Sequence, residues 1–138
     1  TLETQAICAS LTYLSLSTEV FKLMEGEEAH GGDIETSIML YLAPKLVDMS
    51  KAIKDWDIPK SRFIKYGVEP YGESFNVSGG SVQFVDWMSR VTKTGLLGDP
   101  TKASAERGKK MFELLVNALA DFIKEFKERE IRPRHDHH

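Results

Sequence analysis

His30-Gly-Gly-Asp-Ile-Glu-Thr-Ser-Ile-Met-Leu-Tyr-Leu-Ala-Pro-Lys-Leu-Val-Asp48 is the stretch that decides the fold of this 138-residue chain. Behind its glycine pair, apolar residues recur at spacings of three and four, which predicts an amphipathic or buried helix. These residues are Ile34, Ile38, Met39, Leu42 and Leu46. We expect Asp33 to be the N-cap of this helix. Because proline ends or kinks a helix, it should end near Ala43, before Pro44.

A second helical pattern begins at Thr101. Its apolar stripe consists of Phe112, Leu115, Leu119, Phe122 and Phe126. On the opposite face, Glu106 and Lys110 form a favourable i, i+4 pair. The preceding Asp99-Pro100 is a good helix entry, since proline is tolerated in the first turn. We predict one long helix that ends at about Glu128.

The remaining segments have weaker signals. Leu11–Ser17 alternates apolar and polar residues, as a strand does, and Ser17–Met24 is compatible with a short helical stretch. Glu25–Gly32 carries too much glycine and charge for regular structure and is predicted to be a loop. Residues 48–100 are expected to be long loops with short strands, of which Val82–Trp87 is the best candidate. This alternation of strands, helices and loops predicts part of an α/β fold, compatible with half of a layered αβα domain.

The composition limits both the size and the class of the protein. With 41% hydrophobic residues the chain can form one domain with a core. We assign residues 1–130 to that domain and residues 131–138 to a flexible tail. The 21 acidic and 18 basic side chains give a net charge of -3, so no basic field for nucleic acid is present and no such partner is expected.

No sequence feature indicates a membrane-bound or exported protein. The longest apolar stretch, Ile38–Pro44, is far shorter than the roughly 20 residues that a transmembrane helix needs, and no basic-then-apolar signal segment opens the sequence. The single cysteine, Cys8, cannot form an internal disulfide, and we expect it to be a small buried residue. We therefore predict a cytoplasmic protein with no membrane partner.

Glu35 is the first candidate for chemistry. It lies three, four and seven residues before three members of the apolar stripe, on the inward face, where an unpaired carboxylate is strongly unfavourable. A metal ion, a histidine or a buried arginine would each serve as its partner, and Gly31 and Gly32 let the backbone bring His30 close. From these residues alone, an ordinary first-turn carboxylate favoured by the helix dipole remains the alternative.

Two motifs carry a resemblance to a known family. The run His30–Asp48 resembles the creatininase-family motif H-(A/G)-G-x-x-E-T-S-x-M-L followed by P-x-L-V-D. The run Gly95-Leu-Leu-Gly-Asp-Pro-Thr-Lys-Ala-Ser-Ala-Glu-Arg-Gly108 is similar to the family's closing G-x-x-G-D-P-x-x-A-(S/T)-x-E-K-G before its last helix. Because both motifs occur in the family's order, the resemblance implies that the chain is the C-terminal part of a three-layer αβα creatininase-like fold.

The resemblance also implies an activity. Creatininase-family enzymes hydrolyse amide or cyclic amide bonds at a site with two divalent metal ions, which would be Zn, Mn or Fe. Carried over, His30 is the acid that assists the leaving nitrogen, and Glu35 lies at the metal centre, as a ligand or as a base for the attacking water. We favour the ligand role for Glu35. The reaction would be hydrolysis of a small-molecule amide by a metal-activated water.

Several of the family's ligand segments are absent from this sequence. An E-x-H-G segment, an aspartate soon after it and an N-G-H segment lie upstream of the part matched here. Three of the four histidines, His135, His137 and His138, lie in the tail, and Thr1 has no methionine before it. We expect the missing ligands on an N-terminal half of the same protein or on a second chain, within a homo-oligomer. The alternative is a non-catalytic subunit or remnant that acts as an interaction module.

The substrate is constrained by one departure from the family. Members that hydrolyse creatinine have a tryptophan four residues before the motif histidine, whereas this chain has Gly26, which argues against creatinine. Other members deformylate a formylamino-pyrimidine nucleotide, which we favour, or trim a peptide. Trp56 and Trp87 are predicted to be packing residues, with substrate contact as the alternative. The acidic residues Glu25, Glu27 and Glu28 are predicted to be solvated, with contact of one of them with the site as the alternative, since they lie close to His30 in the sequence.

Overall fold

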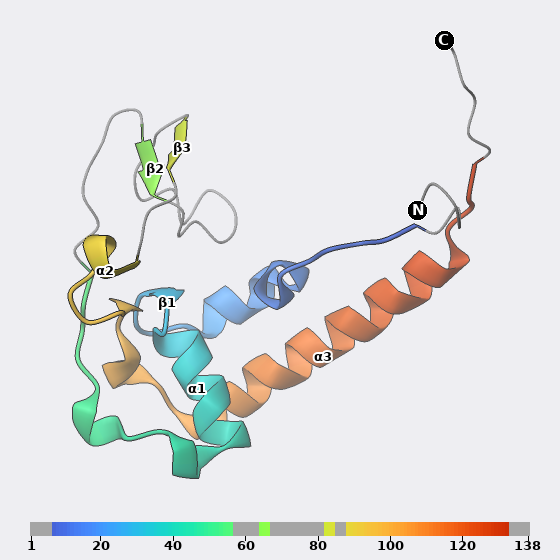
Figure 1. Ribbon diagram of the computed structural model, residues 1–138. Coiled ribbons are helices and arrows are strands. Elements are labelled where there is room, and N and C mark those ends of the chain that lie inside the picture. Colours follow the sequence, from blue (N-terminus) through green and yellow to red (C-terminus); the bar gives the residue numbers. More distant parts are fainter. Residues whose placement is uncertain (1–6, 57–63, 67–81, 85–87, 133–138) are drawn as a thin grey trace.

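The structure, a computed structural model, describes residues 7–56, 64–66, 82–84 and 88–132 (Figure 1). The α-helices are α1 (Asp33–Leu42), α2 (Met88–Val91) and α3 (Ala105–Glu128). The strands are β1 (Glu28–His30), β2 (Ile64–Tyr66), β3 (Val82–Phe84) and β4 (Leu97–Gly98). Short 3-10 helices are η1 (Tyr13–Leu16), η2 (Thr18–Leu23), η3 (Pro44–Leu46), η4 (Met49–Lys51) and η6 (Pro100–Lys102).

The strands form two small ribbons. β1 pairs antiparallel with β4 through Glu28–Gly98 and His30–Leu97, with an irregular register between the two pairs. β2 pairs in parallel with β3. The prediction of a loop over Glu25–Gly32 is therefore wrong in its centre, which is β1. The predicted strand Val82–Trp87 is confirmed over Val82–Phe84, and its last residues lie outside the described part of the chain.

The core lies where α1 crosses the first half of α3 (Figure 1). It consists of the buried residues Leu14, Val20, Ile34, Ile38, Met111 and Leu115. The helices approach so closely that a Cβ at Gly108 would lie 1.8 Å from the carbonyl oxygen of Ser37. The second motif thus supplies a glycine at the contact with the first motif's helix. None of the helices in the described residues is long and apolar enough to cross a membrane.

Both predicted helices are present, with one shifted start. α1 ends at Leu42, as the following Ala43-Pro44 predicts, and α3 ends at Glu128. The start of α3 is wrong by four residues. Asp99 caps the short helix η6 by accepting a hydrogen bond from the Thr101 amide (3.1 Å), and α3 then begins after its own N-cap, Ser104.

The two predicted apolar stripes are only partly buried. Ile34 and Ile38 belong to the core, but Met39, Leu42 and Leu46 are 39%, 51% and 79% exposed. In α3, Leu115 is buried and Leu119 is 38% exposed, while Met111, which the stripe omits, is fully buried. The two helices therefore keep an apolar surface that the described residues do not cover.

Two predictions near the N-terminus are wrong. Leu11–Ser17 is not a strand, because Tyr13–Leu16 forms the 3-10 helix η1 and buries Leu14 against α3. A strand needs a hydrogen-bonded neighbour, and no described strand pairs with this segment. Cys8 is exposed and not buried.

Candidate functional site

The candidate site lies where β1 turns into α1. The first amides of a helix have no partner within the helix and need acceptors from elsewhere. Asp33 was expected to supply one as the N-cap, and this is wrong, because the N-cap is Gly32 and Asp33 is the first helical residue. The acceptor is the carboxylate of Glu28, which receives hydrogen bonds from the amides of Gly32 (3.1 Å), Ile34 (2.6 Å) and Glu35 (3.1 Å).

Glu28 is a buried carboxylate that the sequence prediction missed. Only 1% of its surface is exposed, so the prediction of a solvated acidic run is wrong at this position. Burial raises the pKa of Glu28 to about 7, against the opposing effect of the three amide hydrogen bonds. Glu25 is solvated as predicted, and Glu27 forms an ion pair with Lys54 at 2.5 Å.

Asp33 is a second buried carboxylate, and its partners lie in the segment before β1, on α1 and on α3. It is fully buried and accepts hydrogen bonds from the amides of Glu25 (2.7 Å) and Gly26 (2.9 Å) and from the Ser37 hydroxyl (3.0 Å). Arg107 on α3 donates to both of its oxygens, at 2.7 and 3.0 Å. Burial raises the pKa of Asp33, but these hydrogen bonds outweigh burial and hold the pKa below its usual value.

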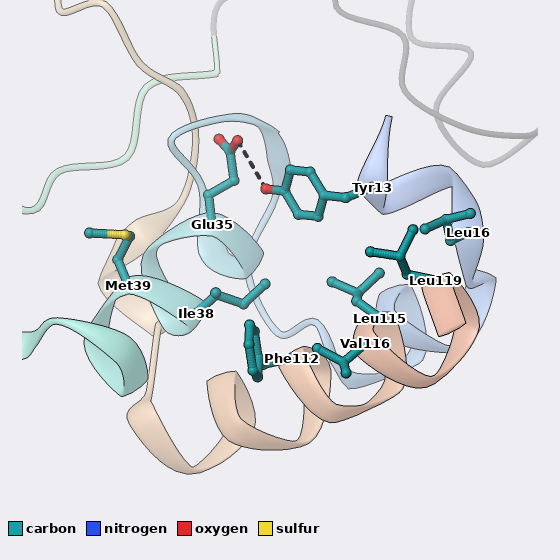
Figure 2. A pocket seen from close by; sticks show the side chains of 9 residues that line it. All are labelled: Tyr13, Leu16, Glu35, Ile38, Met39, Phe112, Leu115, Val116 and Leu119. Atoms are coloured by element: carbon teal, nitrogen blue, oxygen red, sulfur yellow. Dashed lines mark hydrogen bonds between the residues drawn. The ribbon is translucent and has the colours of Figure 1, made fainter. Parts of the chain in front are cut away.

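The carboxylate of Glu35 is half-buried and lies at the edge of a cavity (Figure 2). Its Oε2 accepts a hydrogen bond of 2.5 Å from the Gly31 amide, and its Oε1 accepts a long one of 3.4 Å from the Tyr13 hydroxyl. Neither of these partners is the histidine or arginine that the sequence left open. The hydrogen bond to Gly31 turns the Glu35 side chain back toward the end of β1.

His30 is the last residue of β1 and is exposed. It precedes Gly31, whose φ of 66° lies in the left-handed region that glycine adopts at no steric cost. The Glu35 carboxylate accepts a hydrogen bond from the amide of Gly31, which is the residue directly after His30. The structure thus brings the two predicted site residues to one turn, as the glycine pair predicts.

The cavity beside Glu35 has a volume of about 400 Å³ (Figure 2). It is lined by Tyr13, Leu16, Glu35, Ile38, Met39, Phe112, Leu115, Val116 and Leu119. These residues come from η1, α1 and α3, and apart from Glu35 and the Tyr13 hydroxyl their side chains are apolar. Glu35 is therefore a single carboxylate at the margin of an otherwise apolar hollow.

Glu35 fits the role of one metal ligand in this setting. Its Oε2 is fixed by a short hydrogen bond, while the long hydrogen bond at Oε1 leaves lone pairs for a cation. A carboxylate is a normal ligand for a divalent metal ion. Within the described ranges no three histidine, cysteine, aspartate or glutamate side chains group closely enough to hold a metal ion.

Of the other candidates from the sequence, Trp56 lies within the described ranges and the rest lie outside them. Trp56 is half-buried, next to the bridge between Asp55 and Gly98. Trp87 and the tail histidines fall outside the described residues. Arg107, which was not selected from the sequence, binds Asp33. The signal that could have identified it is its place in the closing motif, directly before Gly108.

The sequence and fold of the chain match those of known enzymes. The profile of the creatininase family, described as creatinine amidohydrolase, matches residues 4–123, and the chain therefore belongs to the creatininase family. The creatinine amidohydrolase of Pseudomonas putida is 33% identical over 96 residues, which make up 70% of this chain and 30% of that protein. The mycofactocin precursor peptide peptidase of Mycolicibacterium smegmatis is 31% identical over 98 residues, or 70% of this chain and 33% of that protein.

Solved structures of the same family have the same fold. A creatinine amidohydrolase homologue from Bacteroides fragilis superimposes with a TM-score of 0.66 at 22% identity, over 92% of this chain and 46% of that one. A Zn-Zn type variant of creatininase has a TM-score of 0.59 at 26% identity, over 86% of this chain and 42% of that one. The prediction of a creatininase-like α/β fold is confirmed. The chain spans about a third of the length of its curated relatives and less than half of these structures.

Proposed function

We propose that this chain is part of a metal-dependent amidohydrolase that cleaves a C–N amide bond, with His30 and Glu35 in its active site. The observation that carries the proposal is the hydrogen bond between the Glu35 carboxylate and the Gly31 amide. It holds the carboxylate beside the turn that bears His30, within the family's first motif, and leaves lone pairs on Oε1, which accepts only the long hydrogen bond from Tyr13. A glutamate at the third helical position that only caps the helix start can make a similar bond, so the family match over residues 4–123 supports the catalytic interpretation beside this geometry.

The proposed roles follow from the positions of the two side chains. Divalent metal ions, two per complete site and of the Zn, Mn or Fe type, would supply a Lewis acid and a water of lowered pKa. Glu35 would bind one of them through Oε1 while Gly31 keeps Oε2 in place. His30 is exposed at the end of β1, where it can give a proton to the leaving nitrogen of the amide.

The remaining ligands belong, in this proposal, to an N-terminal half of the same protein or to a second chain. The apolar surface of α1 and α3 supports such a partner, since Leu42, Val116 and Ile123 are 51%, 45% and 48% exposed. The cavity beside Glu35 opens within this surface. We further propose that the complete protein is a cytoplasmic homo-oligomer, on the basis of its single cysteine and its family.

The structure supports a substrate other than creatinine. A Cβ at Gly26 would lie 2.4 Å from the carbonyl oxygen of Asp99, which is backbone and cannot turn away. No tryptophan fits at this position without moving the backbone at Asp99, so the wall that creatinine-hydrolysing members place there has no equivalent. We propose a formamide, such as a formylamino-pyrimidine nucleotide, or a peptide amide as the substrate.

The test uses the complete protein, expressed with the coding sequence that precedes Thr1. Glu35→Gln should lower the metal content and abolish turnover, because a neutral amide is a poorer ligand for a divalent cation. His30→Asn should keep the metals and slow turnover by about 10²–10⁴-fold. Glu106→Gln, at an exposed position of α3, is the control and should change neither.

Two results would contradict the proposal. If Glu35→Gln and His30→Asn both keep full metal content and activity, the motif is structural in this protein. If the preceding coding sequence has neither an E-x-H-G nor an N-G-H segment, the alternative of a non-catalytic interaction module gains the advantage.

A further inference from the structure

Glu28 binds the same turn that carries the two proposed site residues. Its Oε1 accepts from the Gly32 amide, and its Oε2 accepts from the amides of Ile34 and Glu35. Glu35 in turn accepts from the Gly31 amide. The two carboxylates therefore close a ring of hydrogen bonds around residues 28–35, and His30 lies inside that stretch of backbone.

The turn is built closely around the Glu28 side chain. A Cβ at Gly32 would lie 3.1 Å from the Glu28 Cδ and 2.3 Å from the Glu27 carbonyl oxygen. Glu28 itself is 1% exposed. A buried carboxylate is costly, and a buried apolar residue would fill the same space at lower cost. Its presence indicates that the hydrogen bonds it makes are needed at this place.

Glu28 is bound to the backbone of the turn and lies apart from the cavity. Its oxygens are already bound to three backbone amides, and its side chain does not line the cavity beside Glu35. Through these amides Glu28 acts on the backbone of residues 32–35, which carries the Glu35 side chain.

We propose that Glu28 is a positioning residue, which fixes the backbone of Glu35 so that the Glu35 carboxylate stays anchored on Gly31 beside His30. The inference rests on the proposed roles of His30 and Glu35. Residues that orient a metal ligand without touching the metal commonly change affinity or activity by about 10–100-fold when they are replaced. We expect an effect of this size from Glu28.

The first experiment follows the Gly31 amide in ¹⁵N-labelled chain by NMR. Glu28→Gln replaces one acceptor oxygen with a donor amide group, so at least one of the three hydrogen bonds is lost. The Gly31 amide signal should shift, and its hydrogen exchange should become at least about tenfold faster, as its own bond to Glu35 loosens. Glu27→Gln changes the neighbouring carboxylate, which is paired with Lys54, and should leave the Gly31 amide unchanged.

The second experiment measures the affinity of the complete protein for Zn²⁺ by calorimetry, together with its thermal midpoint. Glu28→Gln should weaken Zn²⁺ binding by about 10–100-fold. The titration is run well below the thermal midpoint of each variant, because the lost hydrogen bond also lowers the midpoint. Glu28→Asp keeps the charge on a shorter side chain and should give an intermediate loss of Zn²⁺ affinity. This variant replaces Glu28→Gln in the experiment if Glu28→Gln does not fold.

The outcomes separate this inference from the proposed function. If Glu35→Gln abolishes Zn²⁺ binding but both Glu28 variants bind as tightly as Glu27→Gln and keep the Gly31 exchange rate, Glu28 has no positioning role and the proposed function stands. If Glu35→Gln itself binds Zn²⁺ normally, the proposed function is wrong and the inference about Glu28 is overturned with it.

Discussion

Replacing Arg107 with methionine should destabilise the chain more than any other change on the surface of α3. Arg107 lies across the junction of both motifs, with its side chain 13% exposed, and holds the fully buried Asp33 by two hydrogen bonds of 2.7 and 3.0 Å. It also donates to the carbonyl oxygens of Leu23 and Lys102. One side chain therefore connects α3 with α1, the end of η2 and η6.

The expected magnitude follows from what Asp33 would lose. Breaking a buried ion pair from one side leaves an uncompensated buried charge and costs roughly 3–5 kcal/mol. Asp33 keeps its hydrogen bonds to Ser37 and to two amides, which favours the lower end of that range. Domains of this size are stable by only about 5–15 kcal/mol, so the loss will be visible as a large shift in the urea midpoint at pH 7.

A matched control and a double-mutant cycle make the test specific. Lys110→Met removes the exposed pair with Glu106 on the same helix and should leave the urea midpoint unchanged within error. Adding Asp33→Asn to Arg107→Met should recover part of the loss, because the buried charge is then gone, and the coupling should be about 1–3 kcal/mol. If Arg107→Met costs no more than Lys110→Met, the buried pair does not hold the two motifs together.

Three further changes test other parts of the structure. The pKa of Glu28 is raised from 4.5 to about 7. Its contribution to the unfolding free energy is therefore fully present below pH 4.5 and is lost as pH rises through 7, a decrease of about 3 kcal/mol. Urea titrations at several pH values should show this decrease, and Glu28→Gln should remove it. Gly108→Ala places a Cβ 1.8 Å from the Ser37 carbonyl oxygen and should cost about 3 kcal/mol or more, since the helices must separate; an unchanged thermal midpoint would contradict this contact. Met111→Ala should lower the unfolding free energy by about 2–5 kcal/mol. Leu46→Ala, at a side chain that is 79% exposed, should change it by no more than about 0.5 kcal/mol. Similar thermal midpoints for the two variants would mean that the core is elsewhere.

The helices were predictable because their signals are local. Periodicity marked both α1 and α3, and Pro44 marked the end of α1 to within one residue. The start of α3 was not predictable from proline alone, because Pro100 opens a 3-10 turn as readily as an α-helix. The hydroxyl of Ser104, which accepts from the Arg107 amide at 3.3 Å, is the actual cap.

Predictions of strand pairing and of burial were less accurate, because they depend on residues far away in the sequence. The alternation in Leu11–Ser17 predicts a strand, but a strand forms only beside another strand, and here the segment folds as η1. Burial of Leu42 and Leu46 likewise needs a second apolar surface, and both are exposed in the described structure.

The motif selected the residues of the candidate site but not their connections. Gly31 and Gly32 predicted that the backbone can bring His30 close to Glu35, and the hydrogen bond from the Gly31 amide to Glu35 lies at that turn. The catalytic and metal-binding roles of the two residues stay predictions. Glu28 was missed because a run of acidic residues is usually solvated, and Asp33 was given its capping role by position alone. The free amides at the start of α1 require acceptors, but only the structure shows which residue supplies them. Gly32 offers no side-chain acceptor and Asp33 faces Arg107, so the acceptor must come from the preceding strand, where Glu28 is the buried acidic residue.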